Sequence, residues 1–480
     1  MTSSRRVLLR TYGCQMNIHD SEKIVNLLRH DGWQATDALE AADLLIVNTC
    51  SIRDKAEHRL YSDLGVLRAW KQASPGRLLG VGGCVAQQQG DGLLRRFPQV
   101  DFVFGTHNLR WVPAMVEAAS RGTRAALTRE SSGSERFDLP DRHPDLEPAT
   151  PGRAFVTVME GCDLFCSFCI VPLTRGREVS RPAAAILHEA ATLAASGVRE
   201  ITLLGQTVNA YGRHDLRRGG GEGTLGFAAL LAQLDAIPGL ARIRYTSPHP
   251  SFFDDALIRA HAELPALCPH VHLPLQSGSD AVLGRMRRRY CADEYRRLVE
   301  RLREARPDLA LTTDLIVGFP GETDGDFEAT LALVREVRFV DAYTFKYSPR
   351  PGTAAARAPD PLPASLLEER LEALQQLLRE LTLAAHRARV GDTSEVLVEG
   401  PSRRGGHQGT GRDPYHRVVN FPMTGESDPA PGELLMLRIV EATPHSLIGE
   451  RLPSVHGALG ALTGTPGQAD EGSWSSVSGP

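Results

Sequence analysis

Short apolar runs alternate with amphipathic stretches through residues 6–120 of the chain. The runs are VLLRTYGC, DLLIVNTC, LLGVGGC and VDFVFG. The first three are followed by segments with helical spacing of their apolar positions, at residues 19–31, at residues 53–70 and, more weakly, near residue 93. Continuously apolar strands followed by helices are typical of a parallel sheet that is covered on both faces. The pattern therefore predicts an α/β domain over residues 6–120.

The alternation returns after a polar, proline-rich stretch at residues 121–152, which predicts a linker. Residues 153–386 contain the strand-like runs AFVTVME, EITLLG, ARIRYTS, HVHLPL, LALTTDLIVGF and DAYTFKYS. Helical stretches begin near residues 182, 227, 253, 280, 293, 324 and 363. Consecutive βα units of this kind predict a (βα)6 partial barrel of the TIM type, with its active face at the carboxyl ends of the strands.

The last part of the chain has no helical spacing. Residues 387–451 hold the short runs TSEVLVEG, HRVVNFP and GELLMLRIVEA, separated by Gly, Pro and Asp, and they predict a small antiparallel β-barrel. Residues 452–480 are rich in Gly, Ser and Pro, and their apolar content is too low for a core, so we expect a disordered tail. The expected fold class is α/β, with a small β domain at the carboxyl end.

Composition excludes some classes of protein. The chain has 480 residues and a formal net charge of −4, which argues against a uniformly basic nucleic-acid binder but leaves room for a local basic face. No window approaches the roughly 18 apolar residues of a membrane span, and the apolar run near Met1 is too short for a signal peptide. We therefore expect a cytoplasmic protein with no membrane partner. Its eight cysteines point to metal or redox chemistry rather than to a disulfide framework.

Three cysteines stand where the first three predicted strands end. They are Cys14, Cys50 and Cys84. Because the carboxyl ends of parallel strands share one edge of a sheet, these thiols can converge although they are far apart in the sequence. Each one taken alone also fits a buried, inert cysteine. Their shared position at three strand ends favours a common metal or cluster site.

Three more cysteines crowd the segment EGCDLFCSFC at residues 160–169, after the first predicted barrel strand. They are Cys162, Cys166 and Cys169. A structural zinc site takes four ligands and usually adds a second Cys-x-x-Cys pair, which this chain lacks. Three thiolates on a 4Fe-4S cluster leave one iron open to substrate, as in a catalytic metal site. The spacing therefore predicts a catalytic iron–sulfur cluster.

These cysteines stand among further motifs: TYGCQMN, NTCSIRDKA, GGCVAQQ, LLGQTVNAYG, TSPHP, LPLQSGSD, MRRRY, DLIVGFPGET and YSPRPGTAA. Over residues 6–450 this set resembles the radical S-adenosylmethionine methylthiotransferase family, most closely the branch that modifies N(6)-dimethylallyladenosine in tRNA. The resemblance implies an amino-terminal methylthiotransferase domain, a radical S-adenosylmethionine barrel and a carboxyl-terminal TRAM domain. It also implies that the barrel cysteines hold the catalytic cluster. Cys14, Cys50 and Cys84 would hold a second, auxiliary 4Fe-4S cluster.

The resemblance implies S-adenosyl-L-methionine as the cofactor. The open iron would bind its amino and carboxylate groups, and the resulting radical would take the hydrogen from C2 of the adenine at position 37 of the anticodon loop, before sulfur insertion and S-methylation. Gln206 would contact the methionine amino group, Ser277 the ribose, and the turn that contains Gly318 and Glu322 the adenine. As alternatives, Gln206 is a capping or turn residue, Ser277 is a helix N-cap, and the glycines simply form the turn.

The implied partners are a tRNA anticodon loop that carries dimethylallyladenosine and an electron donor such as flavodoxin or ferredoxin. Residues 285–306 hold nine arginines against four acidic residues, which fits either the path of the anticodon loop or a solvated helix face. Tyr290 and Tyr295 either stack on bases or pack in the core. Residues 387–451 carry more acidic residues than arginines, which weakens a role of the TRAM-like block in gripping phosphates.

Other functions stay open at this point. A related enzyme would act on threonylcarbamoyladenosine in tRNA or on an aspartate of a ribosomal protein, but TSPHP and TYGCQMN favour the first substrate. A non-catalytic zinc- and RNA-binding protein would use the same cysteines structurally and would leave the S-adenosylmethionine motifs unexplained. Thr207 stands where the family motif has asparagine, a small polar change. Cys268 and Cys291 belong to neither cluster set.

Overall fold

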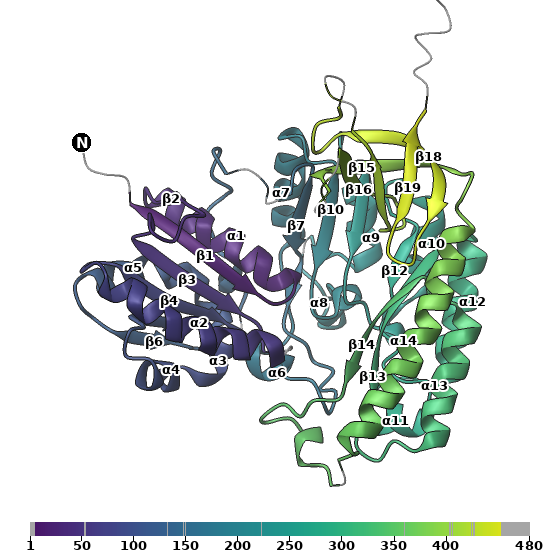
Figure 1. Ribbon diagram of the computed structural model, residues 1–480, viewed down its shortest axis with the longest axis horizontal. Helices are drawn as coiled ribbons and strands as arrows, with labels where there is room; N and C mark the ends of the chain where they lie inside the picture. Colours follow the sequence, from purple (N-terminus) through teal and green to yellow (C-terminus); the bar gives the residue numbers. More distant parts are fainter. Residues whose placement is uncertain are drawn as a thin grey trace, which may run out of the picture.

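The computed structural model places the amino-terminal unit beside the barrel, which carries the carboxyl-terminal unit at one end (Figure 1). The structure describes residues 5–452 apart from 52–53, 132, 147, 149, 222, 360, 403–404, 406, 424 and 426–427. From residue 453 on, the expected disordered tail lies outside the described residues. No helix in these described ranges combines the length and the apolar composition needed to cross a bilayer.

The amino-terminal sheet is parallel throughout, in the order β2-β1-β3-β4-β5-β6. Its strands are β1 (Arg6–Tyr12), β2 (Gln34–Ala35), β3 (Leu44–Thr49), β4 (Leu78–Gly83), β5 (Phe102–Phe104) and β6 (Ala125–Leu127). The helices are α1 (Gln15–His30), α2 (Asp54–Gln72), α3 (Cys84–Gln89), α4 (Asp91–Arg96), η1 (Thr106–Trp111) and α5 (Val112–Ser120). Leu44 and Ile46 face α1 and α5, whereas Leu45 and Val47 face α2, α3 and α4. Both faces are covered, so β3 is buried along its whole length.

The structure differs from the expected linker at residues 121–152. β6 lies inside that stretch and pairs in parallel with β5, with Ala125 opposite Phe102, and the short helix η2 (Ser134–Phe137) follows. β6 has the sequence AAL, and a run of three residues is too short to predict a strand. The two exposed residues of β2 are missed for the same reason.

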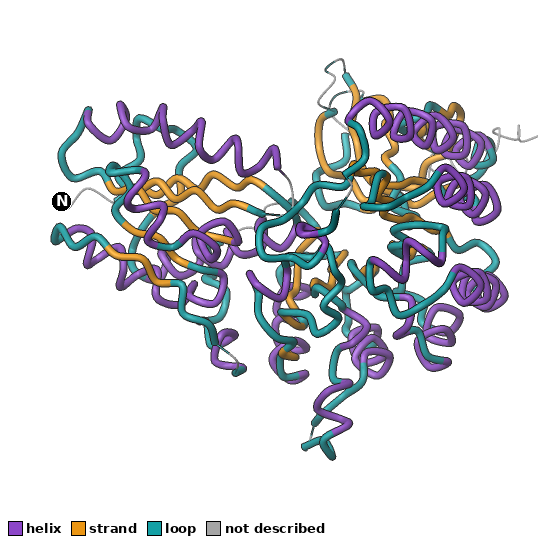
Figure 2. The backbone as a smooth tube through the Cα atoms, turned by 90° about the horizontal axis from the view of Figure 1, so that it is seen from below, coloured by secondary structure: helices purple, strands orange, loops and turns teal. Residues whose placement is uncertain are grey.

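The barrel strands run parallel in two hydrogen-bonded groups, β7-β10-β11 and β12-β13-β14. They are β7 (Arg153–Thr157), β10 (Glu200–Leu204), β11 (Arg242–Tyr245), β12 (His270–His272), β13 (Ala310–Val317) and β14 (Asp341–Lys346). The outer helices are α7 (Ala183–Ala195), α9 (Phe227–Asp235), α10 (Asp255–Glu263), α11 (Asp280–Arg285), α12 (Ala292–Ala305), α13 (Asp324–Val337) and α14 (Ala364–Arg387). Between the groups the ladder is reduced to one bridge, from Ile243 to Leu267, because β11 and β12 are short. Figure 2 shows helices around the outer side of these strands.

The carboxyl-terminal unit is a closed barrel in the order β15-β16-β17-β19-β18. Its strands are β15 (Thr393–Pro401), β16 (Gln408–Arg412), β17 (Val418–Pro422), β18 (Leu434–Ala442) and β19 (Leu447–Arg451). Val396, Val419 and Leu437 belong to its buried core. The sequence predicted three of these strands in a purely antiparallel barrel. The structure adds β16 and β19, and β19 pairs with β17 in parallel.

A buried ion network joins this barrel to the amino ends of the β7, β10 and β11 strands. The carboxylate of Glu200 is fully buried, 3.1 Å from Arg153 Nε, 3.0 Å from Arg244 Nε and 3.7 Å from Arg242 NH1. Arg242 NH1 also donates to the carbonyl oxygen of Arg412 at 3.0 Å. Glu200 and Arg242 begin β10 and β11, so the carboxyl-terminal barrel occupies the end of the TIM-type barrel opposite the strand carboxyl ends.

Candidate active site

Cys14, Cys50 and Cys84, the N-terminal triad, lie together at the carboxyl edge of the first sheet. Cys50 directly follows β3 and Cys84 directly follows β4, and the residues before them, Thr49 and Gly83, are partners in the ladder. Cys14 is the N-cap of α1, just beyond β1. The Cys50 thiol lies within hydrogen-bonding reach of the other two. The structure thus brings together the thiols at the three strand ends.

The environment of the N-terminal triad favours thiolates at two of its three cysteines, Cys14 and Cys84. The hydrogen bond from Cys50 is the main cause that lowers the pKa of Cys14 to about 6, and it lowers the pKa of Cys84 to about 7, against the effect of burial. The positive charge of Arg175 acts in the same direction on both. The pKa of Cys50 is raised, because its proton is shared with both neighbours. Thiolates are the form of cysteine that binds metal.

Two asparagines from the quoted motifs hold the N-terminal triad in place. Cys14 Sγ lies 3.3 Å from Asn17 Oδ1, to which its thiol form donates, and Asn17 Nδ2 donates to Asn48 Oδ1 at 3.2 Å. Gly83, with φ +94°, lies so close to Asn48 and Thr49 that a Cβ would collide with both. Asn17 and Asn48 were not predicted as site residues, although each stands within three residues of a triad cysteine.

Cys162, Cys166 and Cys169, the barrel triad, occupy a loop that the antiparallel pair β8 (Met159–Glu160) and β9 (Val179–Ser180) closes. The Cys162 N–H donates to the carbonyl oxygen of Gly176 at 3.2 Å, and Arg288 NH1 donates to Cys166 Sγ at 3.5 Å. The loop also contains the short helix α6 (Val171–Thr174). Burial raises the pKa of Cys162 and raises that of Cys169 to about 12. The three side chains belong to one small packed cluster.

Gln206 lies beside the barrel triad. Its Oε1 accepts a hydrogen bond from the Gly161 N–H at 2.5 Å, whereas its Nε2 is buried without a partner. Thr207 Oγ1 lies 3.1 Å from Cys162 Sγ. A buried donor without a partner is costly, so Gln206 Nε2 is available to a ligand bound at this face.

Three family models match successive parts of the chain: the uncharacterized protein family UPF0004 at residues 6–105, the radical SAM superfamily at 156–334 and the TRAM domain at 387–452. A relative from Geobacter metallireducens, named tRNA-2-methylthio-N(6)-dimethylallyladenosine synthase, is 49% identical over 94% of this chain and 99% of its own length. One of the same name from Cereibacter sphaeroides is 48% identical over 94% of this chain and 100% of its own length. The chain belongs to this family.

A solved structure shares the fold. The radical S-adenosylmethionine methyltransferase TsrM from Kitasatospora setae, with cobalamin and a [4Fe-4S] cluster bound, aligns with a TM-score of 0.54 at 16% identity. The alignment covers 74% of this chain and 77% of that one. The expected fold class, an α/β protein with a radical S-adenosylmethionine barrel and a TRAM domain, is confirmed.

Both triads fit the iron–sulfur clusters and the S-adenosylmethionine that this synthase family implies. Each offers three thiols, the soft ligands of such clusters, and the free Nε2 of Gln206 is a polar donor beside the barrel triad. Within the described part of the chain, no group of three or more His, Cys, Asp or Glu side chains is arranged to hold a single metal ion. In a 4Fe-4S cluster each thiolate binds a different iron, so the ligands need not meet at one point.

The structure gives Ser277 and the turn at 318–322 partners inside the protein. Ser277 is fully buried, and its Oγ lies 3.2 Å from Thr330 Oγ1; the N-cap of α11 is Ser279, not Ser277. Gly318 has φ +74°, and a Cβ there would collide with Leu367 of α14. Glu322 Oε2 accepts from the Gly318 N–H at 2.7 Å and pairs with Arg370 at 2.7 Å. These side chains brace the turn, and their contacts to the cofactor remain a prediction.

The tyrosines of the arginine-rich stretch pack in the core. Tyr295 is fully buried and donates to the Leu273 carbonyl at 2.8 Å, and Tyr290 donates to the Leu275 carbonyl at 2.8 Å. Neither ring is free to stack on a base. Of the arginines in this stretch, Arg288 contacts Cys166 directly.

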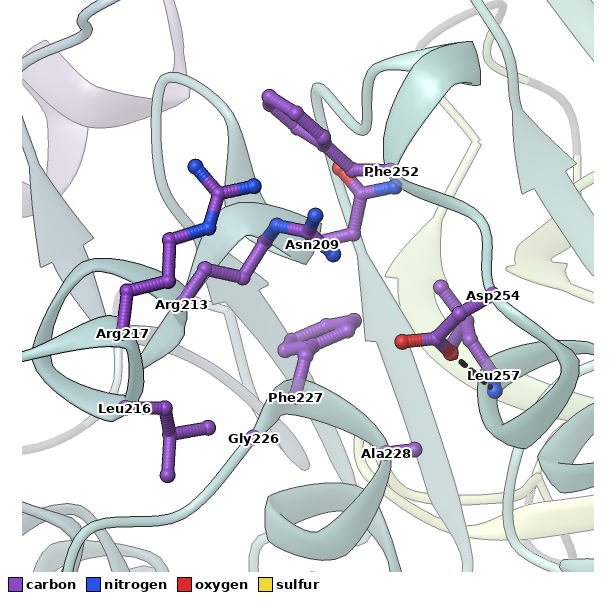
Figure 3. A pocket seen from close by; sticks show the side chains of 10 residues that line it. All are labelled: Asn209, Arg213, Leu216, Arg217, Gly226, Phe227, Ala228, Phe252, Asp254 and Leu257. Atoms are coloured by element: carbon purple, nitrogen blue, oxygen red, sulfur yellow. Dashed lines mark hydrogen bonds between the residues drawn. The ribbon is translucent and has the colours of Figure 1, made fainter. Parts of the chain in front are cut away.

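A pocket of about 220 Å³ opens near the amino ends of α9 and α10 (Figure 3). Arg213 and Arg217 extend from α8 (Arg213–Arg217) on one side, and the ring of Phe227 lies on the other. Arg213 Cζ stands 4.8 Å from the ring centre of Phe252, which also packs against the barrel triad. Aromatic rings and guanidinium groups are the features with which proteins hold unstacked bases and phosphates.

Proposed function

We propose that this chain is a tRNA methylthiotransferase that places a methylthio group on C2 of N(6)-dimethylallyladenosine in the anticodon loop. The observation that carries the proposal is the pair of cysteine triads, in a chain that aligns over 94% of its length with relatives named for this reaction. The relatives' name favours dimethylallyladenosine over threonylcarbamoyladenosine or a ribosomal protein.

Two 4Fe-4S clusters and S-adenosylmethionine, when bound, would supply the radical that removes the C2 hydrogen and the sulfur and methyl group that replace it. The chain's own residues would bind and orient these groups. Cys14 and Cys84 are available as thiolates for the auxiliary cluster, and the Gly161 N–H fixes Gln206 so that its Nε2 stays free. Phe168, inside the cysteine loop, packs edge-on against Phe319 with ring centres 6.4 Å apart, which ties the loop to the turn at residues 318–322.

The partners follow from this reaction. The tRNA anticodon loop would reach the carboxyl face of the barrel, where the pocket with Arg213, Arg217 and Phe252 offers one nucleotide a stacking surface and a phosphate contact. A flavodoxin or ferredoxin would supply the electron that S-adenosylmethionine cleavage consumes. We infer a cytoplasmic location, because the proposed tRNA substrate is in the cytoplasm.

The nucleoside profile of tRNA from cells that lack the protein tests the proposal. We expect 2-methylthio-N(6)-dimethylallyladenosine to disappear and the unmodified N(6)-dimethylallyladenosine to accumulate. The wild-type chain and Cys268→Ala, a buried thiol outside both triads, should restore the product, whereas Cys162→Ala should not. A normal level of the product in the deletion strain would refute the substrate. Loss of a methylthiolated threonylcarbamoyladenosine instead would identify the sister reaction.

A further inference from the structure

Arg175 is buried between the two triads, and the reaction described above gives it no role. Its side chain is only 3% exposed. NH2 donates to Asp20 Oδ2 at 2.5 Å, but NH1 is buried without a partner, and so is Asp20 Oδ1. A buried ion pair with unused donors and acceptors is unfavourable by itself, so the pair indicates a third charged group.

The segment around Arg175 contacts the surroundings of both triads. The carbonyl oxygen of Gly176 holds the Cys162 N–H at 3.2 Å, on the barrel side. On the other side, the carbonyl oxygen of Thr174 accepts from Thr106 Oγ1 of the amino-terminal unit at 2.6 Å. α6, which Arg175 ends, packs against α3, whose first residue is Cys84. Asp20 belongs to α1, which Cys14 caps.

The charges of this pair act on the N-terminal triad. Arg175 stands at the end of α6, against α3 and its first residue Cys84, and Asp20 lies on α1, which Cys14 caps, so both charges lie close to the triad. Arg175 therefore stabilises negative charge at the triad, and Asp20 destabilises it. Inside a protein such effects are weakly screened.

We propose that Arg175 is a positioning residue for the auxiliary cluster, whose reduced form its charge stabilises and to whose sulfur its free NH1 donates a hydrogen bond. The proposal rests on the proposed function, because it requires a 4Fe-4S cluster on the N-terminal triad. Hydrogen bonds and nearby charges are among the means by which proteins set the potential of such clusters. Arg175 lies in the barrel part of the chain, so it also ties the auxiliary cluster to the barrel triad.

Redox titration of the reconstituted full-length protein, followed by electron paramagnetic resonance, tests this role. Added S-adenosylmethionine changes the signal of the barrel cluster and so identifies the auxiliary one. We expect Arg175→Gln to shift the auxiliary midpoint potential to more negative values and Asp20→Asn to shift it to more positive values. Arg175→Lys should keep the auxiliary midpoint potential close to the wild-type value, because lysine keeps the positive charge. The control is Arg136→Gln, a buried arginine whose guanidinium donates to the carbonyls of Ser131, Gly133 and Arg175.

The outcomes separate the role of Arg175 from the proposed function. Opposite shifts in the Arg175 and Asp20 variants, absent in Arg136→Gln, support the proposal, because a purely structural ion pair would give no opposite signs. Selective loss of the auxiliary iron in Arg175→Gln, with retention in Arg136→Gln, also supports it. An unchanged potential with both clusters present overturns it. A wild-type chain with only about four irons overturns the auxiliary cluster itself, and this inference with it.

Discussion

Replacing Gly176 with alanine perturbs the contact between the two halves of the active site. Gly176 has φ +68°, a conformation that costs a residue with a Cβ about 1–2 kcal/mol. The added Cβ would stand 2.8 Å from Cε1 of His107, which is closer than real Cβ contacts, so the ring or the segment must move. Overpacking of this kind costs about 1–3 kcal/mol. We expect Gly176→Ala to lower the free energy of unfolding by about 2–5 kcal/mol in total.

Gly197→Ala is the matched control, because it separates backbone strain from packing. Gly197 has φ +94°, yet nothing lies within 4 Å of its Cβ position. Gly197→Ala therefore has the backbone strain without the overpacking, and the free energies of unfolding of the two variants should differ by the packing cost of about 1–3 kcal/mol. Urea unfolding of both variants with the same probe measures the difference. An equal decrease in the free energy of unfolding of the two variants would refute the idea that Gly176 packs closely against His107.

The same substitution should change the reaction. Gly176 holds the Cys162 N–H, so a shifted segment moves the barrel triad relative to the N-terminal triad. We expect Gly176→Ala to form more 5′-deoxyadenosine for each methylthiolated nucleoside than the wild type, because radical formation continues while sulfur transfer misses its geometry. Gly197→Ala should keep the wild-type ratio. An unchanged ratio in Gly176→Ala would show that the segment does not set the distance between the triads.

Three further predictions follow from the same structure. Alanine at all positions of the N-terminal triad should leave S-adenosylmethionine cleavage intact, remove product formation and halve the iron content; normal product formation would identify inert thiols. Arg213→Ala combined with Arg217→Ala should weaken binding of an anticodon stem-loop and reduce the salt dependence by up to about two charges, with cleavage unchanged; an unaltered dissociation constant would exclude this pocket from RNA binding. Glu200→Gln should lower the free energy of unfolding by about 3–5 kcal/mol at pH 7, measured by urea unfolding, because it removes the fully buried carboxylate that Arg153, Arg242 and Arg244 share. Arg153 and Arg242 keep Glu399 and Glu395 as second partners, so the buried Arg244 should carry most of this cost. Burial alone would raise the pKa of Glu200, but Arg244, Arg153 and Arg242 hold this pKa below its usual value. The stability that Glu200 contributes is therefore fully present above the ordinary glutamate pKa of about 4.3 and is lost as the pH falls through the lower pKa of the folded state. The variant and the wild type should become equally stable in acid.

The convergence of the N-terminal triad could be predicted because it depends only on topology. Buried parallel strands read as continuous apolar runs, and a residue that follows each strand must lie at the carboxyl edge. The ladder places Thr49 beside Gly83, so the next residues, Cys50 and Cys84, are neighbours whatever their side chains. The barrel triad could be predicted for a similar reason, because its spacing lies within one short loop.

The partners of single side chains could not be predicted, because they come from distant elements. Ser277 pairs with Thr330 of α13, and Glu322 pairs with Arg370 of α14, both about fifty residues away. A motif shows that a serine or a glutamate is present but not which helix lies against it. The same limit explains Arg175, whose partner Asp20 stands in another domain of the sequence.

The missed strand β16 has a different cause. Its sequence QGTGR contains two glycines and no large apolar residue, which favours a loop. In the barrel, Gly409 lies against the ring of Phe421 and Gly411 against Val396 and the Leu397 backbone, so large neighbours fill the space that side chains on β16 would need. A small closed barrel requires such small residues, and the local pattern then resembles a turn.

The two adjacent residues Arg175 and Gly176 connect the surroundings of the two triads, which both have to act on one base. Gly176, whose carbonyl oxygen accepts from the Cys162 N–H, directly follows Arg175, whose side chain pairs with Asp20 of α1. One peptide bond therefore separates the contact to the barrel triad from the contact to the helix that Cys14 caps. A hinge motion between the units would have to break the pair between Asp20 and Arg175, because the two residues belong to different units. This ion pair and the hydrogen bond from the Cys162 N–H to Gly176 therefore restrain the position of one triad relative to the other, and a rearrangement of the two clusters around one base would first have to break the pair.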